Sequence, residues 1–130
     1  MYLVDSSIWI NHFRRNDPSL EAALKADLVV THPFVIGELA LGSLHNRNNT
    51  LSLLKNLRSV VEAENSEVLH LIETRNLHNR GLGFVDAHLL ASTIVSTNTS
   101  LWTADKRLND VASEFDIAGS HLRPVNLPAT

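Results

Sequence analysis

Four acidic residues stand where catalytic groups collect in α/β proteins. They are Asp5, Glu38, Asp86 and Asp105. The apolar run Tyr2-Leu3-Val4 has the character of a short buried strand, and Asp5 follows it directly. Ligands gather at the carboxyl ends of the strands in an open parallel sheet, so an acid at this point is placed for chemistry if other acids join it.

Carboxylates that share a cleft repel one another and raise one another's pKa, so they must share protons or bind a cation. Ligands that are all oxygen favour Mg²⁺ or Mn²⁺, which keep several waters and serve phosphate chemistry. The reaction that fits is phosphodiester hydrolysis. One metal ion, or two about 3.5–4 Å apart, would lower the pKa of the attacking water.

Each acid also has a purely structural explanation. An Asp that follows a strand is more often a turn or cap residue than a ligand. Asp86 and Asp105 both stand where a helix cap or a first-turn acid is favoured. Glu38 lies between Ile36 and Leu39 in an otherwise apolar segment, where a solvated helix face is the alternative. The four acids together, rather than any one of them, indicate a metal site for phosphodiester hydrolysis.

Other side chains could support the acids or serve packing and capping instead. Ser6, Ser7 and Thr103 have hydroxyls that could orient a water or a ligating carboxylate. For Ser7 we favour helix capping. The histidines show no spacing that suits a metal, so we expect them at the surface or in packing. Trp9 and Trp102 are expected in the core.

Short strands alternate with longer helices along the chain. Helices are predicted over 7–14, from Asp17-Pro18, from Pro33 toward Leu44, over 50–57, from the cap Ser66 through Leu77, from Val85 to Val95, and from Asp105 onward. Strands are predicted at 2–4, 28–31, 60–61, 100–103 and 125–127, with a turn at Gly81–Gly83. This order predicts an α/β fold in layers, with a central, mainly parallel sheet flanked by helices.

Length and composition predict one globular domain over residues 1–130, with 44% hydrophobic and 19% charged residues. The absence of cysteine excludes disulfides and thiolate chemistry and suits a reducing compartment. No signal peptide or membrane span is expected, which favours a cytoplasmic location. A net charge of −3 makes any nucleic-acid binding a local property of the surface.

The ordered motifs carry a resemblance that spans nearly the whole chain. Asp5 with Ser6-Ser7-Ile8-Trp9-Ile10 comes first, then Glu38, Val85-Asp86-Ala87 and Trp102-Thr103-Ala104-Asp105. This series resembles PIN-domain ribonucleases, specifically the VapC-type toxins of toxin–antitoxin pairs.

The resemblance implies a PIN-like three-layer fold and a metal-dependent endoribonuclease, with Mg²⁺ or Mn²⁺ as cofactor. It also implies a homodimer and an antitoxin that wraps the toxin and blocks its cleft. Asp5, Glu38, Asp86 and Asp105 match the family's acidic quartet. Thr103 matches the hydroxyl residue two places before the last acid. For the further acid or amide that sometimes follows, Asn109 is the nearest candidate, with Asp110 behind it.

Four cationic residues flank two of the acids in the sequence. Arg14, Arg15, Lys106 and Arg107 could form a positive rim that meets RNA phosphates, and a solvated helix end is the alternative for each. Two other functions remain open. A non-catalytic RNA-binding or regulatory module would use the acids as caps. A phospho-acceptor role for Asp5 ranks lower, because Ser7 stands where a haloacid-dehalogenase phosphatase would have an Asp. The RNA target does not follow from a local motif.

Overall fold

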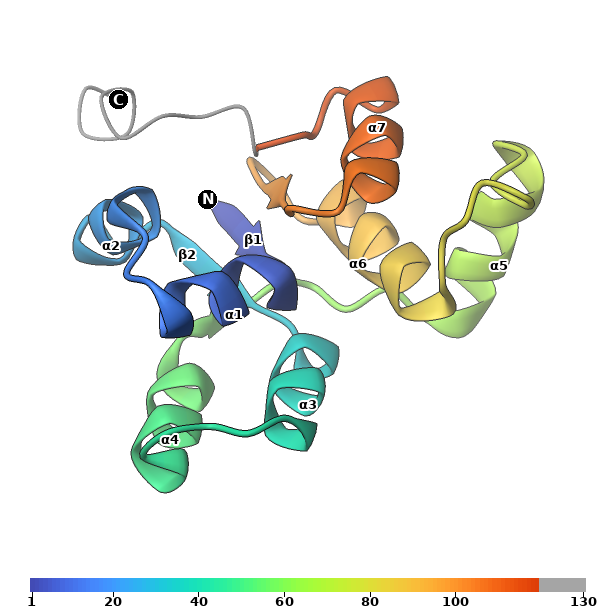
Figure 1. The fold of residues 1–130 in the computed structure, drawn as a ribbon. Helices are drawn as coiled ribbons and strands as arrows, with labels where there is room; N and C mark the ends of the chain where they lie inside the picture. Colours follow the sequence, from blue (N-terminus) through green and yellow to red (C-terminus); the bar gives the residue numbers. More distant parts are fainter. Residues whose placement is uncertain (120–130) are drawn as a thin grey trace.

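A parallel sheet of four short strands lies at the centre of the computed structural model, which describes residues 1–119 (Figure 1). The strands are β1 (Tyr2–Val4), β2 (Val29–Thr31), β3 (Arg58–Ser59) and β4 (Ser100–Trp102). They lie in the order β3-β2-β1-β4, and Leu3 of β1 pairs with Val30 on one side and Leu101 on the other. All three strand pairs are parallel, which confirms the predicted sheet.

Seven helices flank this sheet within residues 1–119. They are α1 (Ser6–Arg14), α2 (Pro18–Lys25), α3 (Pro33–Leu41), α4 (Arg47–Asn56), α5 (Asn65–Thr74), α6 (Phe84–Val95) and α7 (Lys106–Glu114). Figure 1 shows α1 to α4 on one side of the view and α5 to α7 on the other, with the strands between them. The layered α/β fold is therefore confirmed.

Aspartates begin three of the helices. Asp5 Oδ1 accepts the Ser6 amide, Asp17 accepts the amides of the first turn of α2, and Asp105 does the same for α7. Pro18 occupies the first turn of α2, where its missing N–H costs nothing. These caps fix where the chain turns from strand or loop into helix.

The helix that begins at Pro33 is shorter than predicted. It ends at Leu41 instead of continuing toward Leu44, because Gly42 adopts an extended conformation and its amide bonds back to Leu39. The next helix begins at Arg47, three residues before the predicted start at Thr50. Asn46 precedes it in the left-handed conformation, which asparagine tolerates better than most residues.

The predicted bounds of the third strand and the fifth helix were also wrong by a few residues. The strand predicted at 60–61 lies at Arg58–Ser59. Ser66 is not a cap, because α5 begins at Asn65 with a capping box in which the Glu64 amide donates to Glu67 at 2.9 Å. The helix ends at Thr74 rather than Leu77, just before the left-handed Asn76. The strand predicted at 125–127 lies outside the described residues.

The core is formed by β1, β4 and the inner faces of the helices. Leu3, Val4, Leu101, Leu89 and Leu90 are fully buried. Trp9 and Trp102 are both buried, as predicted. Among residues 1–119, no helix has the length and apolar character needed to cross a membrane.

Candidate active site

The sheet brings the two ends of the acidic series together. Val4 pairs with Trp102, so the carboxyl ends of β1 and β4 lie side by side. The Asp5 amide donates to the Trp102 carbonyl at 2.9 Å. The Asp5 side chain is buried at this edge, and Asp105 follows three residues after Trp102 as the cap of α7.

Both carboxylate oxygens of Asp5 are held by neighbouring donors. Oδ1 accepts the Ser6 amide at 2.8 Å, and Oδ2 accepts the hydroxyls of Ser7 and Thr103, each at 2.8 Å. Thr103 Oγ1 in turn accepts the Asp105 amide at 3.0 Å. The predicted capping role of Ser7 is wrong, because Asp5 is the cap and the Ser7 hydroxyl points to it.

Glu38 and Asp86 come from helices and join the same cluster. Glu38 Oε1 accepts the Ser6 hydroxyl at 3.1 Å, which ties α3 to the start of α1. Burial raises the pKa of Glu38, and the charges of Asp5 and Asp86 raise that pKa further, against a hydrogen bond from Ser6.

Asp86 lies in the first turn of α6, where its Oδ2 accepts the Gly83 amide at 3.0 Å. Burial raises the pKa of Asp86 as well, and the charges of Asp5 and Asp105 add to that effect. The charges of Asp5, Asp86 and Asp105 therefore act on Glu38 or Asp86. The structure brings Asp5, Glu38, Asp86 and Asp105 into one electrostatic cluster.

Comparison with known proteins agrees with this arrangement. The PIN domain family matches residues 2–114 of the chain. This chain belongs to the PIN-domain family. It is 46% identical over 118 residues to Ribonuclease VapC32 of Mycobacterium tuberculosis, from strain CDC 1551 / Oshkosh and from strain ATCC 25618 / H37Rv. The alignment covers 91% of this chain and 95% of the relative, so the predicted resemblance to the VapC type is confirmed.

PIN-domain ribonucleases generally depend on a divalent metal, and the donor set of this PIN domain suits such an ion. Glu38 Oε2, Asp86 Oδ1 and Asp105 Oδ2 accept no hydrogen bond from the described residues. None of the four acids forms an ion pair within residues 1–119. Clustered carboxylates with free oxygens and no cationic partner have the chemistry that a hard cation requires.

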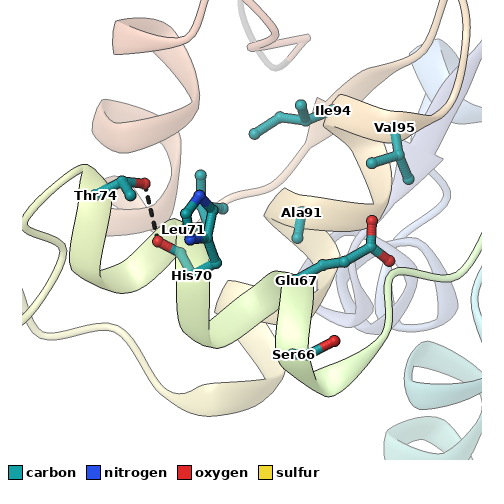
Figure 2. A pocket seen from close by; sticks show the side chains of 8 residues that line it. All are labelled: Ser66, Glu67, His70, Leu71, Thr74, Ala91, Ile94 and Val95. Atoms are coloured by element: carbon teal, nitrogen blue, oxygen red, sulfur yellow. Dashed lines mark hydrogen bonds between the residues drawn. The ribbon is translucent and has the colours of Figure 1, made fainter.

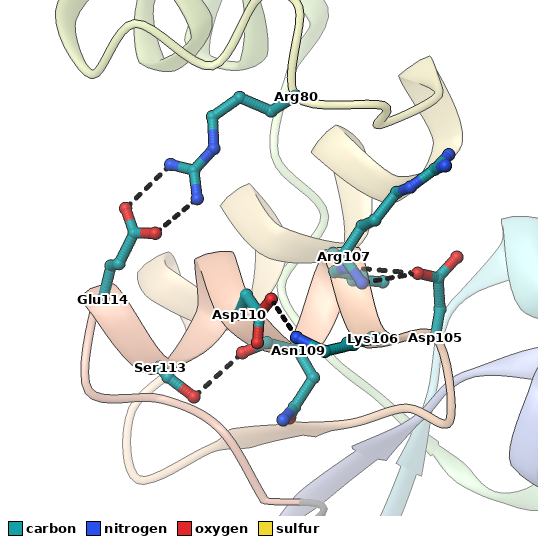
Figure 3. A network of polar contacts seen from close by, with 9 residues as sticks. Arg80, Asp105, Lys106, Arg107, Asn109, Asp110, Ser113 and Glu114 are labelled. Atoms are coloured by element: carbon teal, nitrogen blue, oxygen red, sulfur yellow. Dashed lines mark hydrogen bonds and ion pairs between the residues drawn. The ribbon is translucent and has the colours of Figure 1, made fainter.

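The four acids have suitable oxygen ligands, but their side chains are not yet arranged around one ion. Over residues 1–119, no three acidic or histidine side chains stand close enough to hold one metal ion. Asp86 accepts a hydrogen bond from the Gly83 amide. Asp105 accepts hydrogen bonds from the first turn of α7, including that of Arg107 (Figure 3). Carboxylates must therefore turn toward one another before they can share an ion.

The predicted supporting residues lie around the acids of this PIN domain. Ser6 joins Asp5 to Glu38 through its amide and hydroxyl, and Thr103 joins Asp5 to Asp105. Asn109 lies one helical turn after Asp105, and its amide donates to the Asp105 carbonyl. A catalytic role for Asn109 stays a prediction.

Two of the four predicted cations lie at the end of α1, and the other two lie at the start of α7. Arg14 and Glu38 line the same hollow of about 420 Å³, and Arg15 is exposed beside Arg14. Lys106 pairs with Asp110 at 2.9 Å, so part of its charge is neutralised (Figure 3). The Arg107 side chain lies against Gly81, where an added Cβ would stand 2.7 Å from its Cδ. Their contact with RNA stays a prediction.

A separate hollow of about 360 Å³ lies between α5 and α6 (Figure 2). Its lining is mainly apolar on the α6 side, with Ala91, Ile94 and Val95, and polar on the α5 side, with Glu67 and His70. None of the four acids lines it. This hollow is therefore separate from the four acids.

One contributor to the site was given the wrong role by the sequence analysis, and one was missed. For Ser7 we favoured capping over the orientation of a carboxylate, although a hydroxyl two residues after a strand-end acid can reach back to that acid. The Gly83 amide that holds Asp86 lies in the turn predicted at Gly81–Gly83. Asp86 stands three residues after Gly83, the spacing at which an acid in a capping box accepts the N-cap amide, so this spacing is a signal that could have predicted the contact.

Proposed function

We propose that this PIN domain is a divalent-metal-dependent endoribonuclease that hydrolyses RNA phosphodiester bonds and acts as the toxin of a type II toxin–antitoxin pair. The observation that supports the proposal is the electrostatic interaction among four acids from different elements, in which the charges of Asp5, Asp86 and Asp105 act on Glu38 or Asp86. The relative named Ribonuclease VapC32, at 46% identity, supports the same activity.

Glu38, Asp86 and Asp105 would hold Mg²⁺ or Mn²⁺ through their free oxygens, and Asp5 through the lone pair that Oδ1 keeps. When bound, such an ion lowers the pKa of the attacking water and neutralises charge on the phosphate. Glu38 and Asp86 retain protons more readily than ordinary acids, so they must ionise before they become ligands. Thr103 and Ser6 keep the carboxylates of Asp5 and Glu38 in place.

The remaining partners follow from the same proposal. Arg14, Arg15, Lys106 and Arg107 would meet RNA phosphates, since a chain with net charge −3 binds nucleic acid only through a local positive surface. We also propose a cognate antitoxin protein that covers the cleft, a homodimer, and a cytoplasmic location.

The test is cleavage of RNA by the purified protein. We expect cleavage with Mg²⁺ or Mn²⁺, loss of cleavage with EDTA, and loss by at least about 100-fold in Asp5→Asn, since electrostatic groups of this kind are worth that much. Asp27→Asn is the matched control: Asp27 is exposed, pairs with Arg58 and has a left-handed backbone that asparagine accepts. Activity that survives both EDTA and Asp5→Asn would end the proposal.

A non-catalytic RNA-binding module is the second candidate. One observation favours it. Asp105 caps α7, and Asp86 accepts the amide of Gly83 at the start of α6, so both acids stabilise helix ends without a metal. This function predicts RNA binding without turnover and no heat of Mn²⁺ binding in calorimetry. Metal-dependent cleavage by the wild-type protein would exclude it.

A further inference from the structure

A second hydroxyl, besides that of Thr103, ties the end of β1 to the turn between β4 and α7. Ser7 Oγ donates to Asp5 Oδ2 at 2.8 Å and accepts the Ala104 amide at 3.0 Å. Its hydrogen bonds go to Asp5 and to the turn after β4, and none goes to an amide of its own helix. A serine that only capped α1 would accept such an amide.

The two hydroxyls determine which oxygen of Asp5 remains open. A carboxylate oxygen offers two lone-pair positions. Oδ2 receives both Ser7 and Thr103, so its positions are filled. Among residues 1–119, Oδ1 receives only the Ser6 amide, which leaves one position. The carboxylate is therefore held with a single lone pair available to a further partner.

The same two hydroxyls accept successive amides of one turn. Ser7 accepts the amide of Ala104, and Thr103 accepts that of Asp105. Because both hydroxyls also donate to Asp5, the position of this carboxylate is linked to the turn that begins at Thr103. Together with the backbone bond between Asp5 and Trp102, this network contributes to the spacing between Asp5 and Asp105.

We propose that Ser7 is a positioning residue that presents Asp5 to a divalent cation through Oδ1 alone and contributes to the spacing of Asp5 from Asp105. The inference rests on the proposed function as a metal-dependent nuclease. Without the Ser7 hydroxyl, Oδ2 regains a free lone pair and the Ala104 amide loses its acceptor. The carboxylate can then rotate, and the preorganisation of the ligand is lost.

The test measures Mn²⁺ affinity by calorimetry on the full chain, with the melting temperature recorded for each variant. Groups that orient a metal ligand are worth about 10–100-fold in affinity, so we expect Ser7→Ala to weaken Mn²⁺ binding by that factor. Ser7→Thr restores a hydroxyl and should return the affinity toward the wild-type value. Ser113→Ala removes a hydroxyl that bonds within α7, to the Asn109 carbonyl, and should leave the affinity unchanged.

A crystal structure of metal-free Ser7→Ala protein tests the positioning itself, and we expect the Asp5 carboxylate to be rotated. If Ser7→Ala does not fold, Ser7→Cys keeps the volume with only a weak donor and takes its place. Wild-type affinity in the variant, or an unmoved carboxylate, overturns the inference while the proposed function stands. A wild-type protein that neither binds Mn²⁺ nor cleaves RNA refutes the proposed function instead.

Discussion

At the scale of single residues, the ionised Glu38 side chain lowers the free energy of unfolding of the metal-free protein. Its pKa is raised by burial and by the charges of Asp5 and Asp86. The folded chain therefore holds this proton more tightly than the unfolded chain, and its contribution to stability is lost as pH rises through the raised pKa. We expect Glu38→Gln to stabilise the metal-free protein at neutral pH by up to about 1 kcal/mol, a limit suited to a partly exposed charge.

Urea unfolding at neutral pH and near pH 4 measures this effect. Near pH 4 the difference between Glu38→Gln and wild type should disappear, because both side chains are then largely uncharged. Glu73→Gln replaces an exposed glutamate on α5, outside the acid cluster, and serves as the control. A Glu38→Gln variant no more stable than wild type at neutral pH would show that the repulsion is absent.

The types of the site residues were predictable, whereas their contacts were not. Asp5 and Asp105 follow strands that the apolar pattern marks clearly, so their meeting at one sheet edge follows from parallel pairing. The bond between Ser7 and Asp5 depends on the side-chain geometry at one helix start, and local sequence does not distinguish it from a cap. Glu38 was recognised only as an acid in an apolar helix, because its partner Ser6 lies 32 residues away.

At the scale of elements, the turn before α6 determines where Asp86 lies. Gly81 has φ +80°, a conformation that residues with a Cβ rarely adopt, and the Arg107 side chain lies against it. We expect Gly81→Ala to lower the free energy of unfolding by about 1–2 kcal/mol. Gly83→Ala is the control, because Gly83 has φ −84° and its added Cβ would meet nothing closer than 3.7 Å.

Denaturant midpoints of the two alanine variants test this prediction. Equal loss of stability in both would mean that the backbone at Gly81 imposes no special demand. The turn itself was predictable from its two glycines, as were the existence and order of the helices. The end of α3 was not, because Gly42 stops the helix within a continuing apolar pattern. The start of α5 was not, because the capping box at Glu64 places it before the predicted cap Ser66.

At the scale of the whole molecule, one helix is more apolar on its outer face than a monomer requires. Leu41 of α3 is 90% exposed, and Phe34 on the same helix is also exposed. A Cβ added to Gly37 would meet nothing within 4 Å, so the helix surface there is open. A helix that is apolar around its circumference is usually buried. With the homodimer that the VapC resemblance implies, we expect α3 to contribute to the contact between two copies.

Sedimentation at micromolar concentration measures the oligomeric state. We expect the wild-type protein to be a dimer and Leu41→Glu to be a monomer, because a charge buried in an apolar contact without a partner is strongly unfavourable. Leu53→Glu changes an exposed leucine on α4 and should leave the dimer intact. A dimer that survives Leu41→Glu but dissociates with Leu53→Glu would assign the contact to α4. A wild-type protein that sediments only as a monomer would contradict the predicted dimer.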